Sequence, residues 1–182
     1  MNAQGRVLVK MAVPEAGFDF EAFFHAHYAR MARTVARIVG DTVRAEDLAV
    51  EAFWKLWRTP KAQGQNAAGW VYRTAVRMAL NDLRRDRRRT RYERLSEAGP
   101  SAPTPEEVHA AEQERRQVRA VLAALDERQA ELLMLRASGL SYEQVASALE
   151  LNPASVGTLI SRAQQAFRKE FVKQNGQPKS GQ

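Results

Sequence analysis

Cysteine is absent from the 182 residues of this chain, which excludes disulfide bonds and thiolate metal sites. Long apolar runs are missing too. Segment 1–17 carries only short ones, interrupted by Lys10 and Pro14, and lacks the apolar core of a signal peptide or membrane span. We therefore predict a cytoplasmic protein without membrane insertion, and we expect residues 1–17 to be poorly ordered.

Alternating strand patterns of useful length are also missing. Glycine and proline number 10 and 7, and the prolines fall outside the periodic segments. Those segments are rich in Ala, Leu, Arg and Glu, which all favour helices. The sequence therefore predicts an all-α fold.

Acidic residues are outnumbered, with 21 Asp and Glu against 28 Lys and Arg, which gives a formal net charge of +7. The sequence pI is about 10.1. This balance favours a polyanionic partner, although many basic proteins bind no particular polyanion.

The chain divides into two small helical domains joined by a flexible linker. Residues 18–95 form the first predicted domain, and 96–105 are the linker, whose Ser, Gly and Pro cannot hold regular structure. Thr104-Pro105-Glu106-Glu107 is a strong helix start, with a cap, a proline at the first position and a glutamate at the third. It opens the second domain, 106–173, and 174–182 form a polar tail.

The first domain reads as three helices. Asp19 caps the first and Gly40 ends it, the second covers about 43–58, and Asn66 caps the third. We interpret Trp54 and Trp57 in the second helix as packing residues.

Residues 139–163 read as a helix-turn-helix, with an ordinary helical hairpin as the alternative. Ser141 and Gln144 can form a capping box for the first of these helices. Asn152 caps the second, and Pro153 occupies its first position. Small, polar or basic side chains are left facing out, as a helix in the DNA major groove requires. They are Ala154, Ser155, Gly157, Thr158, Ser161 and Arg162.

Arginine is concentrated just before the linker. The run consists of Arg84, Arg85, Arg87, Arg88, Arg89, Arg91 and Arg94. Such a density of like charge repels itself unless a polyanion neutralises it. Trp70, Arg73 and Arg77 precede the run at helical spacing, and an aromatic ring beside guanidinium groups can stack unpaired bases. In the alternative, Trp70 lies in the core and the arginines form a solvated face.

Signals for catalysis are weak. His25 and His27 lie two residues apart on a helix and face different directions, which disfavours a metal pair. Asp47 and Glu51 lie one helical turn apart but have no third ligand or nucleophile nearby, so a partner surface or solvated helix suits them better. A Gly-rich phosphate loop is missing. We predict no enzymatic activity, cofactor or metal.

Several motifs together resemble one family. Residues 45–57 (AEDLAVEAFWKLW), residues 69–75 (GWVYRTA), the arginine run, the Pro-rich linker and the helix-turn-helix follow one another as in bacterial RNA polymerase sigma factors of the extracytoplasmic-function (ECF) group. The resemblance covers about 18–172. It implies that the first domain binds the polymerase clamp helices and opens the minus-ten element. The second would bind the minus-thirty-five element and the polymerase flap.

The resemblance also implies partners and site residues. The partners are core RNA polymerase, promoter DNA and an anti-sigma factor that clamps the two domains, with no small-molecule substrate. Polymerase-binding positions are Asp47, Val50, Glu51 and Trp54. DNA-binding positions are Trp70, Arg73, Arg77, Asn81, Arg84, Arg85, Arg87 and Arg88 in the first domain, and Ser155, Thr158, Ser161 and Arg162 in the second. The linker acids would suit an RNA channel, with Glu97, Glu106, Glu107 and Glu112 at and beyond it.

The sequence departs from the family pattern at several of these positions. Val50 stands where Gln is usual, and Ala75-Val76-Arg77 followed by Asn81 stands where the family has Ala-Arg-Asn and then Asp. The family Asn helps to hold a flipped-out promoter base. Positions 157, 158 and 150 carry Gly, Thr and Glu, where Lys, Ser and Gly are common. The promoter sequence therefore cannot be transferred from the family.

Two other functions stay open at this point. A stand-alone helix-turn-helix regulator would bind duplex DNA as a dimer, but would not need the partner helix around Asp47 or an aromatic residue beside arginines. A helical enzyme acting on nucleic acid would need a metal cluster or a nucleophile.

Overall fold

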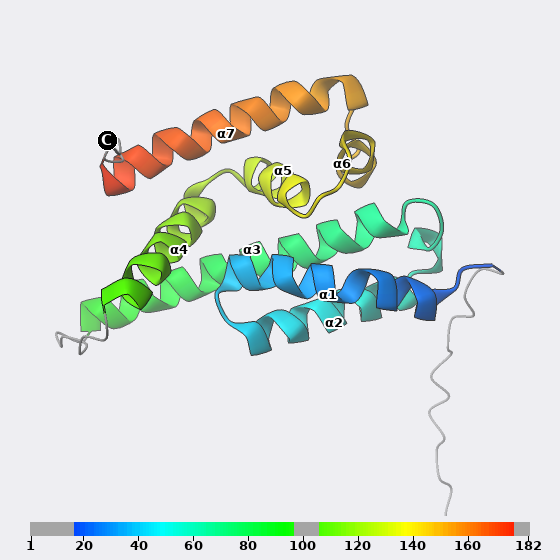
Figure 1. Cartoon of the computed structure of the whole chain (residues 1–182), viewed down its shortest axis with the longest axis horizontal. Coiled ribbons are helices and arrows are strands. Elements are labelled where there is room, and N and C mark those ends of the chain that lie inside the picture. The colour runs from blue at the N-terminus through cyan, green and yellow to red at the C-terminus, as the bar shows by residue number, and fades with distance from the viewer. Residues whose placement is uncertain (1–16, 97–105, 177–182) are drawn as a thin grey trace, which may run out of the picture.

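The computed structural model describes residues 17–96 and 106–176, with side chains described for 17–90 and 110–176. Every regular element in these parts is a helix, as predicted (Figure 1). The elements are α1 (Phe20–Val39), α2 (Thr42–Trp57), the short 3-10 helix η1 (Pro60–Ala62), α3 (Ala67–Ser96), α4 (Glu106–Ala124), α5 (Glu127–Ala137), α6 (Tyr142–Leu149) and α7 (Pro153–Asn175). The predictions for 1–16, for the linker after Ser96 and for 177–182 lie outside the described residues.

Helices α1, α2 and α3 pack together as the first domain. Asp19 accepts a hydrogen bond from the Ala22 N–H and caps α1. Gly40 ends that helix at φ 80°, a left-handed conformation that glycine adopts readily. Phe53 lies at the centre of an aromatic cluster, with its ring centroid 4.8 Å from that of Phe24. The apolar stripes read from the sequence therefore meet in one core.

Helices α4 to α7 form the second domain, and α6 and α7 are the predicted helix-turn-helix. The capping box is present: the Ser141 hydroxyl accepts from the Gln144 N–H, and the Gln144 side chain accepts from the Ser141 N–H. Asn152 accepts from the Ala154 N–H at the start of α7, with Pro153 at its first position. These local signals are therefore confirmed.

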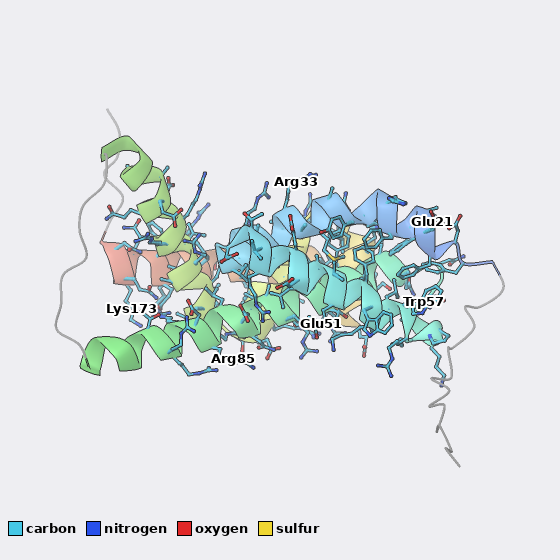
Figure 2. The ribbon with its side chains drawn as sticks, turned by 90° about the horizontal axis from the view of Figure 1, so that it is seen from below. Glu21, Arg33, Glu51, Trp57, Arg85 and Lys173 are labelled. Atoms are coloured by element: carbon cyan, nitrogen blue, oxygen red, sulfur yellow. The ribbon has the colours of Figure 1, made fainter. Side chains whose placement is uncertain are left out.

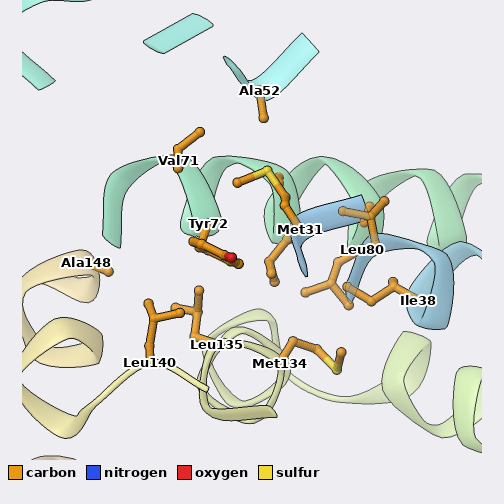
Figure 3. Close-up of a cluster of buried hydrophobic side chains, with 14 of the residues drawn as sticks. Met31, Ile38, Ala52, Val71, Tyr72, Leu80, Met134, Leu135, Leu140 and Ala148 are labelled. Carbon is orange, nitrogen blue, oxygen red and sulfur yellow. The ribbon is translucent and has the colours of Figure 1, made fainter. Parts of the chain in front are cut away.

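The two domains pack against each other along α3, which lies beside α4, α5 and α6 (Figure 1). Buried Met31 and Tyr72 of the first domain face Leu135 and Leu140 of the second in one continuous apolar cluster (Figure 3). At Gly69 the contact is so close that a Cβ atom would lie 3.2 Å from the Ala148 Cβ. A side chain at this position would require α6 to shift by a few tenths of an ångström.

Replacing Ser141 by Ala removes the hydroxyl that caps α6. We expect the free energy of unfolding to fall by about 1 kcal/mol, the usual cost of losing an N-cap side chain. Urea unfolding followed by circular dichroism measures this. Ser147→Ala, at an exposed position inside the same helix, is the control and should change stability by less than about 0.5 kcal/mol. Equal effects of both substitutions would contradict the capping role.

Candidate nucleic-acid and protein interfaces

Helix α2 presents an unusual solvent-exposed face. Trp54 is 57% exposed, and Val43 and Val50 are 72% and 51% exposed. Asp47 and Glu51 are exposed beside them. The face lies on the side of the first domain away from α5, α6 and α7 (Figure 1), and Glu51 is seen on it from below in Figure 2. Large apolar groups flanked by carboxylates are typical of a protein-binding surface.

The two tryptophans of α2 differ in environment. Trp57 packs as expected, with its ring centroid 4.9 Å from that of Phe20. The packing interpretation was wrong for Trp54, because this residue is more than half exposed. Helical periodicity placed both rings near the apolar side of α2, but Trp54 lies beyond the edge of the stripe that α1 and α3 cover.

Two of the predicted DNA-binding arginines on α3 are paired with carboxylates of the second domain. Arg73 donates from Nη1 to the Ala148 carbonyl at 2.8 Å and lies 3.4 Å from Oε1 of Glu150. Arg77 contacts Glu127 at 3.1 Å and Glu131 at 2.9 Å. We call Arg73, Arg77, Glu127, Glu131 and Glu150 the interdomain ion-pair cluster.

Two further arginines reach backbone carbonyls at the end of α4. Arg84 donates to the Leu125 carbonyl at 3.2 Å, and Arg87 donates to the Ala120 carbonyl at 2.7 Å. Carbonyl groups at a helix C-terminus carry partial negative charge and favour cations. These side chains therefore face the second domain as Arg73 and Arg77 do.

The remaining predicted positions on α3 lie outside these contacts. Asn81, Arg85 and Arg88 are exposed, and Arg85 is seen on the underside of α3 in Figure 2. Trp70 is half-buried at the junction with α6, where it borders a cavity of about 300 Å³ that Arg73 also lines. The structure thus splits the predicted set into residues that contact the second domain and residues that remain accessible.

A basic cleft of about 1070 Å³ runs between α3 and α4. Five arginines line it, with Asp86 as the carboxylate among the lining residues: Arg84, Arg87, Arg88, Arg116 and Arg119. Glu112 lies beside the cleft and accepts a hydrogen bond from Arg119 at 2.7 Å. Arg119 and Arg116 together hold the pKa of the Glu112 carboxyl below its usual value. Sequence reasoning missed Arg116 and Arg119, although their spacing of three on one helix signals a shared face.

Glu131 is the buried carboxylate of the interdomain cluster. Burial is the largest effect on the pKa of Glu131 and raises it above 4.5, and the nearby charge of Glu127 raises it further. The positive charges of Arg77, Arg73 and Arg128 lower it, but by less. Its Oε1 lies 2.9 Å from the Arg77 Nε, but that N–H is not aligned with the oxygen. Oε1 accepts no well-aligned hydrogen bond from the described residues. Sequence analysis missed Glu131 because it reads as an ordinary polar residue between Ala130 and Leu132.

The outer face of α7 carries the predicted base-reading residues. Thr158, Ser161 and Arg162 are exposed. Ser155 is half-buried, and its hydroxyl donates to the Asn152 carbonyl at 2.7 Å. Val156 and Ile160 are buried on the opposite face. The N-terminal half of α7 therefore has a polar surface open to a partner.

Comparison with known families accounts for this arrangement. Residues 23–89 match Sigma-70 region 2, and residues 115–166 match Sigma-70, region 4. The two matches together cover more than half of the chain, in the expected order. The chain belongs to the sigma-70 family of RNA polymerase sigma factors, in the ECF group.

Individual relatives agree with this assignment. The chain is 29% identical over 165 residues to the ECF RNA polymerase sigma factor SigE of Mycolicibacterium smegmatis, a match that covers 87% of this chain and 64% of that protein. It is 28% identical to SigK of Mycolicibacterium vanbaalenii, covering 93% of this chain and 90% of the relative.

Solved structures share the fold. CnrH, solved in complex with the cytosolic domain of CnrY, gives a TM-score of 0.56 at 19% identity, covering 86% of this chain and 88% of that one. Sigma factor RpoE, solved with the anti-sigma factor NepR from Bartonella quintana, gives 0.53 at 19% identity, covering 86% and 98%. Within the described residues of this chain, we find no helix long and apolar enough to cross a membrane.

The raised pKa of Glu131 predicts a pH-dependent stability difference. A carboxyl whose pKa is higher in the folded state than in the unfolded state favours folding below its ordinary value of 4.5. That contribution is lost as the pH rises through the folded-state pKa. Glu131→Gln stays neutral, so its melting temperature should rise relative to the parent chain as the pH increases from about 4.5 towards neutrality.

Differential scanning fluorimetry of both proteins across this range measures the effect. The carboxylates whose pKa is lowered, Glu112, Glu143 and Glu170, act in the opposite direction but equally in both proteins. They therefore cancel in the difference. A difference that is constant with pH, or that shrinks as the pH rises, would show that burial does not dominate at Glu131.

Proposed function

We propose that this chain is a promoter-specificity subunit that directs core RNA polymerase to particular promoters and initiates transcription. It performs no chemistry of its own. The main support is the presence of regions 2 and 4 of the sigma-70 family in one chain, in the expected order. The relatives named above are RNA polymerase sigma factors, which agrees with this role.

Polymerase docks, in this proposal, on the exposed face of α2. Asp47 and Glu51 supply negative charge that complements basic residues on the polymerase clamp helices. Val50 and Trp54 supply apolar area, and exposed tryptophan is enriched among the residues that dominate protein interfaces. Val50 replaces the Gln usual in the family, which makes this surface more apolar.

Promoter DNA is bound by both domains. In the first domain we assign contacts with the melted minus-ten strand to the predicted positions on α3. They are Trp70, Arg73, Arg77, Asn81, Arg84, Arg85, Arg87 and Arg88. In the second domain Ser155, Thr158, Ser161 and Arg162 on α7 read the minus-thirty-five element. The positive charge on α3 and the exposed polar face of α7 support this division.

The domain assignment follows the same division. Residues 18–95 bind polymerase and the minus-ten element, 96–105 link the domains, and 106–173 bind the minus-thirty-five element. We propose that the protein acts in the cytoplasm and that an anti-sigma factor regulates it. The complexes of CnrH with CnrY and of RpoE with NepR support such a partner by analogy.

The alternative of a stand-alone helix-turn-helix regulator is less well supported, because it gives no role to the exposed α2 face. Pull-down with core polymerase followed by run-off transcription on genomic promoter fragments tests the proposal directly. Promoter-dependent transcripts that need this chain would support it. Duplex DNA binding without any polymerase binding would favour the regulator.

Charge reversal on α2 tests the polymerase surface. In the double variant Asp47→Lys, Glu51→Lys we expect the affinity for core polymerase to fall at least tenfold. The reason is that the new lysines would meet basic residues of the polymerase, so that attraction becomes repulsion. Surface plasmon resonance with immobilised core enzyme gives the affinity. The melting temperature should change little because both side chains are exposed and surface pairs contribute little to folding. Unchanged polymerase affinity would place the interface elsewhere.

Replacing Arg162 by Ala tests base reading by α7. Loss of a bidentate base contact costs about 1–3 kcal/mol and relaxes preference at one base pair. Loss of a phosphate contact weakens all sequences alike. Binding selections over a randomised upstream element separate these results. If neither affinity nor preference changes for Arg162→Ala, Ser155→Ala or Thr158→Ala, α7 is not the reader.

A further inference from the structure

We propose that the basic cleft between α3 and α4 binds a small molecule that carries a chain of linked phosphates, such as a nucleoside triphosphate. The site holds a ligand and adds no reaction to the chain. It does not depend on the proposed function, because two of the arginines that line it, Arg116 and Arg119 of α4, take no part in the contacts assigned to DNA or polymerase.

The cleft has the size and the position of a ligand pocket. Its volume is about 1070 Å³, just above the range of about 300–1,000 Å³ that is usual for small-molecule sites. It lies where α4 passes α3, close to the end of α1 (Figure 1). Contacts between domains are preferred places for such pockets. A molecule bound there would touch both domains.

Positive charge is in excess at this cleft. Its lining residues include five arginines but a single carboxylate, that of Asp86. Asp86 is itself paired with Arg89 at 2.9 Å. Glu112 beside the cleft is shared by both arginines of α4, with Arg119 at 2.7 Å and Arg116 at 3.4 Å. Five guanidinium groups thus face two carboxylates, which favours an anion with several charges.

A neighbouring cavity shows that this excess is not general along α3. The cavity has a volume of about 430 Å³ and also borders Leu83 and Asp86. Its lining holds three arginines and three aspartates, and Arg44 lies 2.7 Å from Asp82. Because the charges balance there, we expect an anion in the basic cleft rather than in this cavity.

Arg119 is the arginine that the fold holds most firmly at the cleft. Its side chain is only 14% exposed, and the Glu112 carboxylate accepts a hydrogen bond from it. A Cβ atom on Gly40 would lie 2.7 Å from the Arg119 Cζ, so the guanidinium group packs on bare backbone at the end of α1. Arginine has five N–H donors, and those that remain are available to an anion without rearrangement of the side chain.

Arg84 and Arg87 are held in place from α3. They donate to the carbonyls of Leu125 and Ala120 at 3.2 Å and 2.7 Å. These bonds also offset the partial negative charge at the C-terminal end of α4, which would otherwise repel an anion. Glu170 of α7 lies near Arg87 and is itself paired with a lysine. Planar guanidinium groups that are fixed in this way are well suited to phosphate oxygens.

The rest of the lining favours a nucleotide over a nucleic-acid strand. Aliphatic side chains complete it, from Val39, Leu83, Ala120 and Ala123, and these can cover the ribose and base of a nucleotide. Single-stranded nucleic acids are usually held on aromatic side chains. None of the lining residues that the structure describes is aromatic. The lining therefore points to a compact ligand with several phosphates.

Isothermal titration calorimetry of the full chain tests the class of ligand. The probes are ATP, inorganic triphosphate and AMP, in magnesium-free buffer at an ionic strength of about 0.15 M, where long-range attraction is screened. We expect one site per chain for ATP and for inorganic triphosphate. The affinity for AMP should be at least about tenfold lower, because it offers the arginines a single phosphate. Equal affinities for AMP and ATP, or no binding of either triphosphate, would overturn the proposal.

The two triphosphates also identify the source of the phosphates. Tighter binding of ATP than of inorganic triphosphate would support a nucleotide whose base and ribose contact the aliphatic lining. Equal binding of the two would support a site for the phosphate chain alone.

Removing two charges of the cleft tests its place in the fold. In the double variant Arg116→Gln, Arg119→Gln we expect the affinity for inorganic triphosphate to fall at least about tenfold, since charge-assisted hydrogen bonds are lost. The control Arg33→Gln, Arg58→Gln removes the same charge at exposed positions outside the cleft. It should change the affinity less than about threefold. An equal loss in the control would reduce the effect to net charge and overturn the proposal.

A further variant displaces Arg119 without changing any charge. Gly40→Asn places a Cβ atom where the Arg119 guanidinium group lies, and asparagine tolerates the left-handed backbone of this position. We expect the affinity for inorganic triphosphate to fall about three- to tenfold, with helical content unchanged by circular dichroism. If this variant and the double arginine variant both fold and neither binds more weakly, the cleft is not the site.

Fluorescence anisotropy with a labelled single-stranded oligothymidine separates a nucleotide site from a nucleic-acid surface. Arg116 and Arg119 lie outside the positions assigned to DNA, so their double variant should keep its oligothymidine affinity within about threefold of the parent chain. A loss of oligothymidine affinity as large as the loss of triphosphate affinity would show a general polyanion surface and overturn the proposal.

Discussion

The positive charge of α3 is the constraint on which the arrangement of this molecule depends. Arginines are spaced along it at helical intervals, and guanidinium groups this close repel one another unless anions lie between them. In the structure the second domain supplies negative charge and partial negative charge beside them, as three carboxylates and three backbone carbonyls. These contacts join α3 to three helices of the second domain, α4, α5 and α6.

Apolar and ionic contacts have different roles at this interface. Burial of residues such as Met31 and Leu140 drives the two domains together, because removing apolar surface from water is the dominant favourable contribution. The ion pairs contribute less energy, since most of their members are partly exposed. Their value is orientation: they align α5 and α6 with particular turns of α3. Burial of Glu131 raises the pKa of its carboxyl, because desolvation outweighs the attraction of Arg77.

The sequence predicted the local structure well because local signals are strong. Asp19, Ser141 and Asn152 cap their helices as their positions indicate, and the helix-turn-helix follows from capping plus one apolar stripe. Interactions between distant segments had no such signal. Arg77 meets a carboxylate 50 residues away and Arg73 meets one 77 residues away, across a linker of unpatterned composition. Trp54 shows the complementary error, because periodicity alone does not reveal how far neighbouring helices cover a stripe.

The distance between the two domains tests the central claim most directly. Because the chain has no cysteine, Glu21→Cys on α1 with Lys169→Cys on α7 introduces a single pair of labelling sites at exposed positions. Pulsed electron paramagnetic resonance on the spin-labelled protein would report their separation. We predict a single narrow distance population in the free chain, because the two domains pack against each other along α3. A broad distribution in the free chain would contradict the account.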